Sequence, residues 1–228
     1  MKVAIDGPAG AGKSTVAKAV AQGRGFVYLD TGAMYRSVAL LALEGDVDLA
    51  DEAALAAIAE SIELAFVPAA DGGQRVLVAG RDVTSEIRTP RVDAAVSSVS
   101  SVPAVRTSMV ELQRKLAGSA DVVAEGRDIG TVVFPDAEVK VFLTADAHAR
   151  AHRRSVQNTQ RFGADPEQAC EEDIYRRIVE RDRADSTRAT APLVAAEDAV
   201  HIDSSSLGVA EVVRLVEDLI DAAQAQEA

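Results

Sequence analysis

Short apolar runs alternate with longer helix-like stretches along most of this chain. The apolar runs have the length and composition of buried strands, and they occupy residues 2–6, 26–29, 121–125, 139–143 and 201–202. The longer stretches predict helices at 13–22, 34–43, 53–59, 103–116, 145–160, 166–184 and 209–220. Two of them, 145–160 and 166–184, are polar and rich in arginine. Strands that alternate with helices predict a parallel core sheet flanked by helices, the α/β class.

One segment departs from this alternation. Ile62, Leu64 and Phe66 occupy every second position, which is the period of a strand and not of a helix. The Asp-Gly-Gly sequence at 71–73 then turns the chain into residues 75–79. This pattern predicts a small antiparallel β insertion in a helical region.

The composition is that of a globular protein, with 48% hydrophobic and 26% charged residues. No repeat, low-complexity tract or long linker divides the sequence, so we expect a single domain over residues 1–228. Neither a membrane-length apolar run nor a signal peptide is present, so we expect a cytoplasmic monomer without membrane partners. The single cysteine, Cys170, suggests neither a disulfide nor a zinc site.

The charge balance restricts the partners. A net charge of −12 argues against nucleic acid, which needs an extended basic surface, so any phosphate ligand must be held locally. Nine arginines and no lysine lie between Arg150 and Arg188, and a guanidinium grips phosphate oxygens bidentately. A coding bias toward arginine with salt-bridged helix faces is the alternative explanation.

A glycine-rich sequence follows the first predicted strand and opens the first predicted helix. Residues 7–14 fit G-x-x-x-x-G-K-[ST], the P-loop, whose backbone N–H groups and helix N-terminus bind phosphates. Lys13 is expected to reach the β- and γ-phosphates of ATP, and the Ser14 hydroxyl to ligate Mg²⁺. The expected ATP-binding residues of this segment are Gly7, Pro8, Ala9, Gly10, Ala11, Gly12, Lys13, Ser14 and Thr15. The motif arises by chance in roughly one chain in a hundred of this size, and its strand–loop–helix context lowers that further.

The P-loop alone does not fix the reaction, because kinases, motor ATPases and GTPases share it. The sequence contains no N-K-x-D guanine motif, which argues against a GTPase. The apolar run before Glu125 ends in one acid and a glycine, whereas a motor ATPase would place two acids there. Transfer to a small acceptor remains, with a phosphate-sensing module that transfers nothing as the alternative.

Three further segments follow the P-loop in order. They read Asp-Thr-Gly-Ala-Met-Tyr-Arg at 30–36, Gly-Arg-Asp-Ile-Gly-Thr-Val-Val-Phe-Pro at 126–135 and Arg-Ala-Thr-Ala-Pro-Leu at 188–193. Together with the P-loop and the β insertion, they resemble the signatures of bacterial cytidylate kinases, which are nucleoside monophosphate kinases, over almost the whole chain. The resemblance implies transfer of the γ-phosphoryl group of ATP to CMP or dCMP, giving CDP or dCDP and ADP. Another small-molecule P-loop kinase, with a different nucleotide or a metabolite as acceptor, is the alternative.

The same resemblance implies the P-loop nucleoside-monophosphate-kinase fold, with a parallel core sheet, a small antiparallel insertion and an arginine-rich helical lid. It implies a monophosphate-binding region over 31–106, which includes the insertion, and a lid over 148–188. ATP and CMP or dCMP are then the expected partners, and Mg²⁺ with ATP the expected cofactor.

The resemblance also assigns residues to the acceptor. It implies that Arg36 grips the acceptor phosphate, with Thr31 beside the nucleotide and Tyr35 as a wall of the site. The residues that resemble cytosine readers are Ser97, Arg106 and Asp128, and those that resemble phosphate or ribose ligands are Arg127, Arg181, Arg188 and Asp185. The roles are chemically plausible, because cytosine offers an amine donor and two acceptors, which a carboxylate, a hydroxyl and a guanidinium can satisfy.

Structural alternatives remain for several of these residues. Acidic and basic side chains recur every four positions at Asp173, Arg177, Arg181 and Asp185, as in a salt-bridge ladder on one helix face. Arg127 and Asp128 could form a strand-end ion pair, and Tyr35 could serve packing alone.

The expected catalysis needs no general base, because the second pKa of an acceptor phosphate is near 6 and its oxygen is already ionised at neutral pH. Catalysis then consists of alignment and charge neutralisation. The residues expected to supply it are Lys13, Arg36, Arg127, Arg181 and Arg188. Arg150, Arg153 and Arg154 share one helix face and are expected to close over ATP, with Arg153 as an ATP ligand.

Overall fold

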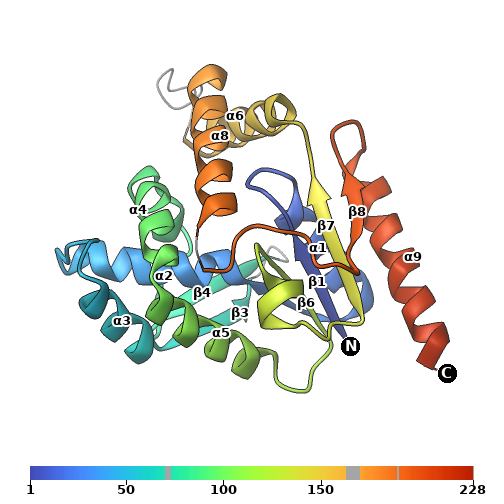
Figure 1. The fold of residues 1–228 in the computed structure, drawn as a ribbon, viewed down its shortest axis with the longest axis horizontal. Helices are drawn as coiled ribbons and strands as arrows, with labels where there is room; N and C mark the ends of the chain where they lie inside the picture. The colour runs from blue at the N-terminus through green and yellow to red at the C-terminus, as the bar shows by residue number, and fades with distance from the viewer. Residues whose placement is uncertain (70–72, 163–169, 189, 228) are drawn as a thin grey trace. The chain divides into compact units, whose positions relative to one another are not determined.

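The structure of the protein is a computed structural model, which describes residues 1–69, 73–162, 170–188 and 190–227 (Figure 1). The chain forms two compact units. The first contains Met1–Leu29 and Ala117–Ala228, and the second contains Asp30–Leu116. The expected monophosphate-binding region, 31–106, is part of the second unit. The expectation of one domain over the whole chain stays a prediction.

The first unit is built on a five-stranded sheet with the order β2-β6-β1-β7-β8. Its strands are β1 (Lys2–Asp6), β2 (Val27–Asp30), β6 (Val122–Gly126), β7 (Val139–Thr144) and β8 (Val200–Asp203). The central strand β1 runs parallel to β6 and β7, and β7 runs parallel to β8. Each strand lies within two residues of its predicted position, so the parallel core is confirmed.

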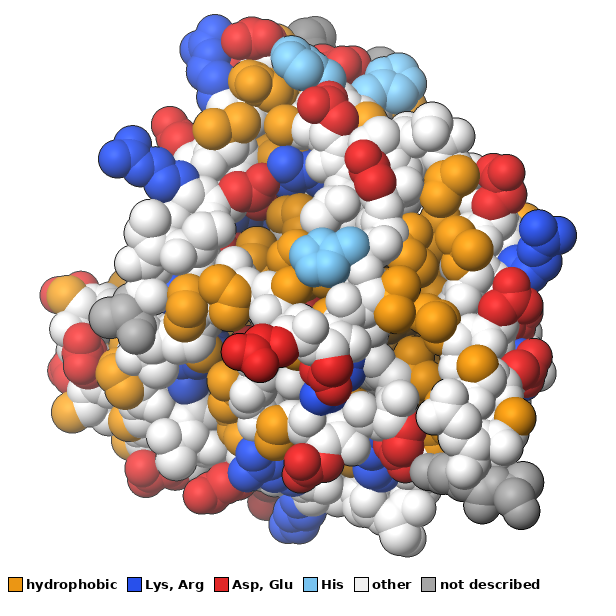
Figure 2. Space-filling view, turned by 45° about the vertical axis from the view of Figure 1, so that its right-hand side comes forward, with side chains coloured by type: hydrophobic (Ala, Val, Ile, Leu, Met, Phe, Trp, Pro, Cys, Tyr) orange, Lys and Arg blue, Asp and Glu red, His pale blue; other side chains and the backbone are white. Residues whose placement is uncertain are grey.

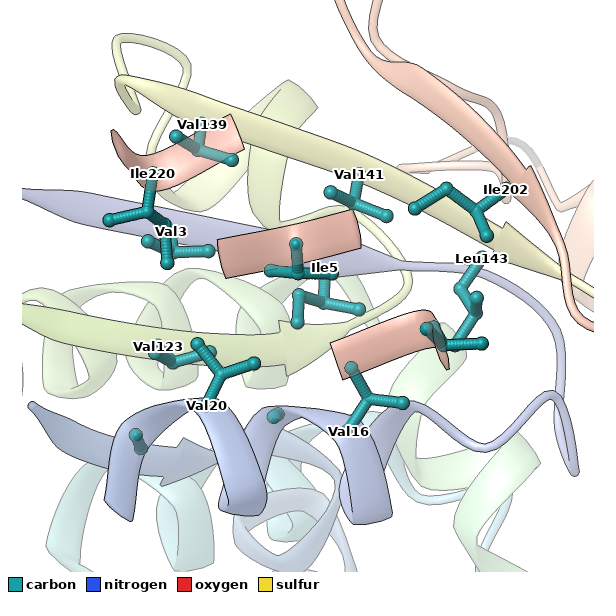
Figure 3. Close-up of a cluster of buried hydrophobic side chains, with 14 of the residues drawn as sticks. Val3, Ile5, Val16, Val20, Val123, Val139, Val141, Leu143, Ile202 and Ile220 are labelled. Atoms are coloured by element: carbon teal, nitrogen blue, oxygen red, sulfur yellow. The ribbon is translucent and has the colours of Figure 1, made fainter. Parts of the chain in front are cut away.

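The core of this unit lies between the sheet and two helices, α1 (Lys13–Arg24) and α9 (Val209–Glu227). Figure 3 shows Val3 and Ile5 of the central strand with Val16 and Val20 of α1 and Ile220 of α9. All five are nearly inaccessible to solvent, and burying such a side chain contributes about 1.5–3 kcal/mol. The apolar faces predicted for residues 13–22 and 209–220 therefore close this core.

Two arginine-rich helices, α6 (Ala147–Phe162) and α8 (Glu171–Thr187), also belong to the first unit and lie side by side (Figure 1). Ala151, Ile174 and Ile178 form a small buried cluster between them. The helix predicted over 166–184 is thus confirmed from Glu171 onward, and residues 163–169 lie outside the described part of the chain.

The second unit contains helices and a three-stranded antiparallel sheet. Its elements are α2 (Thr31–Glu44), α3 (Glu52–Ser61), β3 (Leu64–Pro68), β4 (Gln74–Val78), β5 (Arg81–Asp82), the short helix η1 (Glu86–Arg88), α4 (Pro90–Ser101) and α5 (Pro103–Ala117). The predicted insertion is confirmed, because β3 and β4 pair antiparallel from Leu64–Val78 to Pro68–Gln74. Of the predicted turn, only Gly73 is described. The third strand, β5, was not predicted because it has only two residues, both charged and exposed.

Aspartate side chains cap the N-termini of two helices of the second unit. The Asp30 carboxylate accepts from the Ala33 N–H at the start of α2, and the Asp51 carboxylate accepts from the Ala54 N–H at the start of α3, both at 2.9 Å. Such caps satisfy N–H groups that have no partner within the helix. Among the helices that the structure describes, none combines the length and the apolar character needed to cross a membrane.

Candidate active site

The P-loop joins the central strand to α1 through a backbone that requires glycine at its first position. Gly7 has a φ of 143°, and a Cβ at this residue would lie 2.0 Å from the backbone oxygen of Leu143 on β7. No side chain fits there, since heavy atoms do not approach so closely. The loop then ends at Gly12, whose φ of 97° is left-handed, and α1 begins at Lys13. The predicted strand–loop–helix arrangement, with its helix N-terminus for phosphate, is present.

Four side chains, one from the loop itself and three from distant parts of the first unit, bind the carbonyl groups of this loop. The four donors and their acceptors are Arg127 Nη1 to Gly7 O (2.9 Å), Lys13 Nζ to Pro8 O (2.8 Å), Arg150 Nη1 to Ala9 O (3.0 Å) and Ser204 Oγ to Ala11 O (3.0 Å). Because each bond fixes a different peptide group, the loop is shaped by its surroundings and not by glycine alone.

The Lys13 ammonium group lies in a buried, electrically crowded position. Burial, together with the positive charges of Arg127 and Arg181, lowers the pKa of Lys13 to about 7, although Glu125 and Asp6 act against them. A bound polyanion would favour the charged form of the lysine and raise its pKa again. The protonation of Lys13 is therefore sensitive to any charge placed beside it.

A second group of charged residues surrounds Asp185 near the end of α8. Arg127 Nε donates to Asp185 Oδ2 at 2.8 Å, and Arg188 Nη1 lies 4.0 Å from Asp185 Oδ1. Burial by itself raises the pKa of Asp185, but Arg127, with Arg181 and Arg188, outweighs it and holds the pKa below its usual value. Three arginines thus gather around one carboxylate.

These contacts bear on two alternatives raised by the sequence. Asp185 pairs with Arg127, which follows β6, so this carboxylate does more than complete a ladder along its own helix. Arg127 in turn donates to Asp185 and Gly7. The ion pairs of α8 at its N-terminal end involve Arg176, which lies 3.4 Å from Glu172 and 3.7 Å from Asp173.

The second unit holds the other residues assigned to the acceptor. Arg36 on α2 forms an ion pair with Asp93 on α4, and its Nη1 donates to the Ile87 backbone oxygen at 3.2 Å. The Arg106 guanidinium lies over the ring of Tyr35, 5.4 Å from its centroid. Tyr35 is buried, so it does pack in the unit, and its contact with a ligand stays a prediction.

The remaining two residues of this set are placed by helices of the same unit. Thr31 is the first residue of α2 and is buried, and Ser97 is half-buried on α4, where its backbone oxygen accepts from Ser100 Oγ at 3.2 Å. Helices α2 and α4 pack against each other, so both residues belong to one helix pair.

The sequence model of cytidylate kinases matches residues 3–222 of this chain. The chain belongs to the cytidylate kinase family. It is 53% identical over 215 residues to a cytidylate kinase of Pelotomaculum thermopropionicum, covering 94% of this chain and 93% of that protein. It is 47% identical over 220 residues to a cytidylate kinase of Carboxydothermus hydrogenoformans, covering 96% of this chain and 97% of that protein. A solved structure of an uncharacterized protein from Eubacterium ventriosum, 13% identical, matches with a TM-score of 0.53 over 97% of this chain and 98% of that chain, which concerns the fold alone.

In this member of the cytidylate kinase family, the contacts of several residues near the P-loop were not predictable from the sequence. Arg150 pairs with Asp182 of α8 at 2.7 Å as well as with the loop, so its guanidinium is engaged beside the P-loop and is not directed only toward solvent. Arg153, expected on ATP, donates to Ser204 Oγ at 3.1 Å. Two further residues, Ser204 and Asp6, were not predicted. Ser204 follows β8 and belongs to no motif. Asp6 could have been noticed only because it stands directly before the P-loop.

The side-chain oxygen atoms near the P-loop determine which kind of metal ion the site could hold. Within the described ranges, no group of three or more His, Cys, Asp or Glu side chains could hold a metal ion by itself. Ser14 is exposed at the start of α1, and Glu125 is buried at the end of the neighbouring strand β6. These are hard oxygen ligands, which suit an ion that takes most of its ligands from phosphate and water.

Figure 2 shows one face of the molecule. On that face, acidic and basic side chains are interspersed among those that the figure colours, without an extended basic surface. Positive charges of the first unit lie close together around Lys13 and Asp185.

Proposed function

We propose that this chain transfers the γ-phosphoryl group of ATP to CMP or dCMP, giving CDP or dCDP and ADP. The observation that carries the proposal is the cluster of Lys13, Arg127, Arg181 and Arg188 beside the P-loop of the first unit. A P-loop that only binds a nucleotide would need no positively charged side chain other than its own lysine. Three further arginines, linked by Asp185, serve a reaction in which additional negative charge must be neutralised.

On the donor side, the backbone of residues 7–12 and the N-terminus of α1 would hold the phosphates of ATP, with Lys13 on the β- and γ-phosphates. Ser14 is proposed as the protein ligand of Mg²⁺, and Thr15 and Arg153 as further ATP contacts. When bound, Mg²⁺ supplies positive charge to the phosphate oxygens. Arg153 donates to Ser204 from Nη1 and Nη2 in the structure, and because a guanidinium carries five N–H donors, its proposed contact with ATP does not require it to leave Ser204.

On the acceptor side, Arg36 is proposed to bind the monophosphate, with Thr31 and Tyr35 beside the nucleotide. Ser97, Arg106 and Asp128 are proposed to read cytosine. The Asp128 carboxylate would accept from the exocyclic amine, whereas uracil offers a carbonyl at that position and would leave two acceptors facing each other. Such a mismatch of buried polar groups discriminates strongly.

The transfer itself needs alignment more than proton chemistry. The acceptor phosphate is ionised at neutral pH, so its oxygen attacks without a base. Lys13, Arg36, Arg127, Arg181 and Arg188 are proposed to neutralise charge as the phosphoryl group passes. The region 148–188 is proposed to exclude water, which would otherwise accept the phosphoryl group and hydrolyse ATP.

We also propose that the enzyme acts as a cytoplasmic monomer and does not bind nucleic acid. The net charge of −12 supports the last point, because phosphate-rich polymers are repelled by an acidic surface. Light scattering with size-exclusion chromatography tests the monomer, and a mass of two chains would contradict it.

An acceptor panel tests the proposed reaction. The full chain is incubated with ATP, Mg²⁺ and CMP, dCMP, UMP or AMP, and ADP release is followed. CMP and dCMP should be preferred by at least about 100-fold in kcat/KM, as expected when the wrong base leaves buried groups unpaired. A preference for UMP, AMP or a metabolite would support the alternative of another small-molecule P-loop kinase. ATP binding without acceptor-dependent ADP release would support a phosphate sensor.

A further inference from the structure

Asp6 is a buried carboxylate that the proposed reaction does not use. It is the last residue of β1, directly before Gly7, and only 5% of its surface is exposed. Both carboxylate oxygens accept from backbone N–H groups, Oδ1 from Ile129 at 2.8 Å and Oδ2 from Gly130 at 2.7 Å. Asp6 thus connects the start of the P-loop to a segment more than 120 residues later.

The two N–H groups open the helical turn η2 (Ile129–Val133), which has π-helical geometry. Such turns are rare, and the first N–H groups of any helix lack partners within it. Asp128 stands at the N-cap position, but its side chain makes no capping hydrogen bond. Asp6 therefore performs from another strand the capping that the local sequence does not provide.

A second bond joins the same two segments on the other side of Asp128. Arg127 Nη1 donates to the Gly7 backbone oxygen at 2.9 Å. The neighbours Asp6 and Gly7 thus hold residues on both sides of Asp128, so Arg127 and Asp128 cannot shift independently of the P-loop. The fit is close, because a Cβ on Gly130 would lie 3.5 Å from Asp6 Oδ2 and 3.3 Å from the Lys140 side chain.

Keeping a carboxylate at this position has an electrostatic cost. Burial raises the pKa of Asp6 to about 6, although the hydrogen bonds from Gly130 and Ile129 and the charge of Lys13 lower it. The negative charge of Asp128 acts in the same direction as burial. An asparagine would avoid the charge, but it offers one acceptor oxygen and could not serve both N–H groups.

We infer that Asp6 is a positioning residue for phosphoryl transfer: its two carboxylate oxygens cap η2 and hold Arg127 and Asp128 in register with the P-loop. The inference rests on the proposed function, since Arg127 and Asp128 are acceptor ligands only if that proposal is correct. A small displacement of an acceptor-binding residue lowers the rate by about 100-fold when two substrates must be aligned.

The test compares Asp6→Asn with a matched control in the full-length enzyme. Asp6→Asn should lower kcat/KM for CMP by about 100-fold, while the Kd of a non-hydrolysable ATP analogue rises less than about threefold. Asp121→Asn is the control, because Asp121 stands next to a strand of the same sheet, directly before β6, but is exposed and pairs with the N-terminal amine. It should leave both values within about twofold of wild type. Equal losses for CMP and the ATP analogue in Asp6→Asn, or no loss for CMP, would overturn the inference.

Amide hydrogen exchange provides a readout that needs no substrate. In the wild-type enzyme, the Ile129 and Gly130 amides should be protected like those of the β1–β6 pairing. In Asp6→Asn, their exchange should accelerate at least about tenfold while the β1–β6 amides are unchanged. Fast exchange at both positions in the wild type would contradict the capping role.

The kinetic and the hydrogen-exchange experiments together distinguish a failure of the proposed function from a failure of the inference about Asp6. If the wild-type enzyme ignores CMP, the proposed function fails, and the exchange experiment still decides whether Asp6 caps η2. If exchange accelerates but CMP kinetics stay at wild-type values, Asp6 caps η2 without positioning the acceptor, and the inference is wrong. If Asp6→Asn does not fold, Asp6→Glu replaces it. The longer side chain keeps the charge but moves the oxygens, so it should also reduce kcat/KM for CMP more than ATP affinity.

Discussion

At the scale of single residues, Lys13 and Asp185 show how burial and neighbouring charge prepare an anion site within an acidic protein. The pKa of Lys13 is lowered, so the lysine binds its proton less tightly. The pKa of Asp185 is also lowered, so the carboxylate keeps its charge among the arginines around it. Both residues were expected at the site from the sequence. Their environments were not predictable, because Arg127 lies 58 residues from Asp185 along the chain and reaches it only through the fold.

The lowered pKa of Lys13 predicts a pH dependence for ATP binding. With a pKa of about 7 in the free enzyme and a higher pKa beside phosphates, binding takes up a proton above pH 7. The Kd of a non-hydrolysable ATP analogue should therefore be nearly constant below pH 7 and rise as the pH increases toward 9. Calorimetry at pH 8 in two buffers with different ionisation enthalpies measures the proton uptake, which Lys13→Met should abolish. Proton release on binding would contradict the prediction.

Asp185→Asn should destabilise the enzyme in a way that depends on pH. The substitution removes the negative charge that Arg127 and Arg188 face, and removing one partner of a buried pair costs about 3 kcal/mol in the free energy of unfolding. Because the pKa of Asp185 is lower in the folded state, its contribution is present above the unfolded-state pKa of about 4 and is lost as the pH falls through the folded-state value. Urea unfolding of both proteins at pH 7 and pH 3 measures the difference, which should shrink at the lower pH. A constant difference would show that the charge of Asp185 is not responsible.

At the scale of elements, local signals were sufficient where an element depends on its own sequence. The strand at 2–6, the P-loop and the β insertion were predicted because their hydrophobic periods and glycines are local. The turn η2 was not, since its capping group, Asp6, comes from a strand more than 120 residues earlier. The strand β5 was missed because two charged residues carry no period.

The two capped helices of the second unit offer a matched comparison. Asp30 caps α2, is buried and pairs with Arg88 at 3.0 Å, whereas Asp51 caps α3 and is exposed. Asp51→Ala should lower the free energy of unfolding by about 1 kcal/mol, the usual value of a cap. Asp30→Ala should cost more, about 2–3 kcal/mol, because it also leaves a buried helix end and Arg88 without a partner. Equal costs in urea unfolding would show that the ion pair contributes nothing.

At the scale of the molecule, the sequence was informative about the class of fold and less so about its subdivision. A single domain was expected because no linker interrupts the chain, and this stays a prediction; within the chain, the structure contains two compact units, with residues 30–116 inserted between two parts of the first. Long, well-packed insertions leave no compositional boundary, so such a division is invisible in the amino-acid pattern.

The last helix closes the core of the first unit, which predicts where that unit is vulnerable. Ile220 on α9 is fully buried, so Ile220→Ala should lower the free energy of unfolding by about 2–5 kcal/mol. Leu215 on the same helix is 42% exposed, and Leu215→Ala should cost less than about 1 kcal/mol. Urea unfolding measures both, and similar costs would show that α9 contributes little to the core.

The four bonds to the P-loop carbonyls have a consequence for biosynthesis. Their donors lie 5, 120, 141 and 193 residues from their acceptors along the chain. In a chain emerging from the ribosome, the glycine-rich segment is made well before Arg127, Arg150 and Ser204, whose side chains bind three of its four bonded carbonyls. The P-loop can therefore acquire its full set of these hydrogen bonds only after Ser204 has been synthesised, although its own lysine is present from the start.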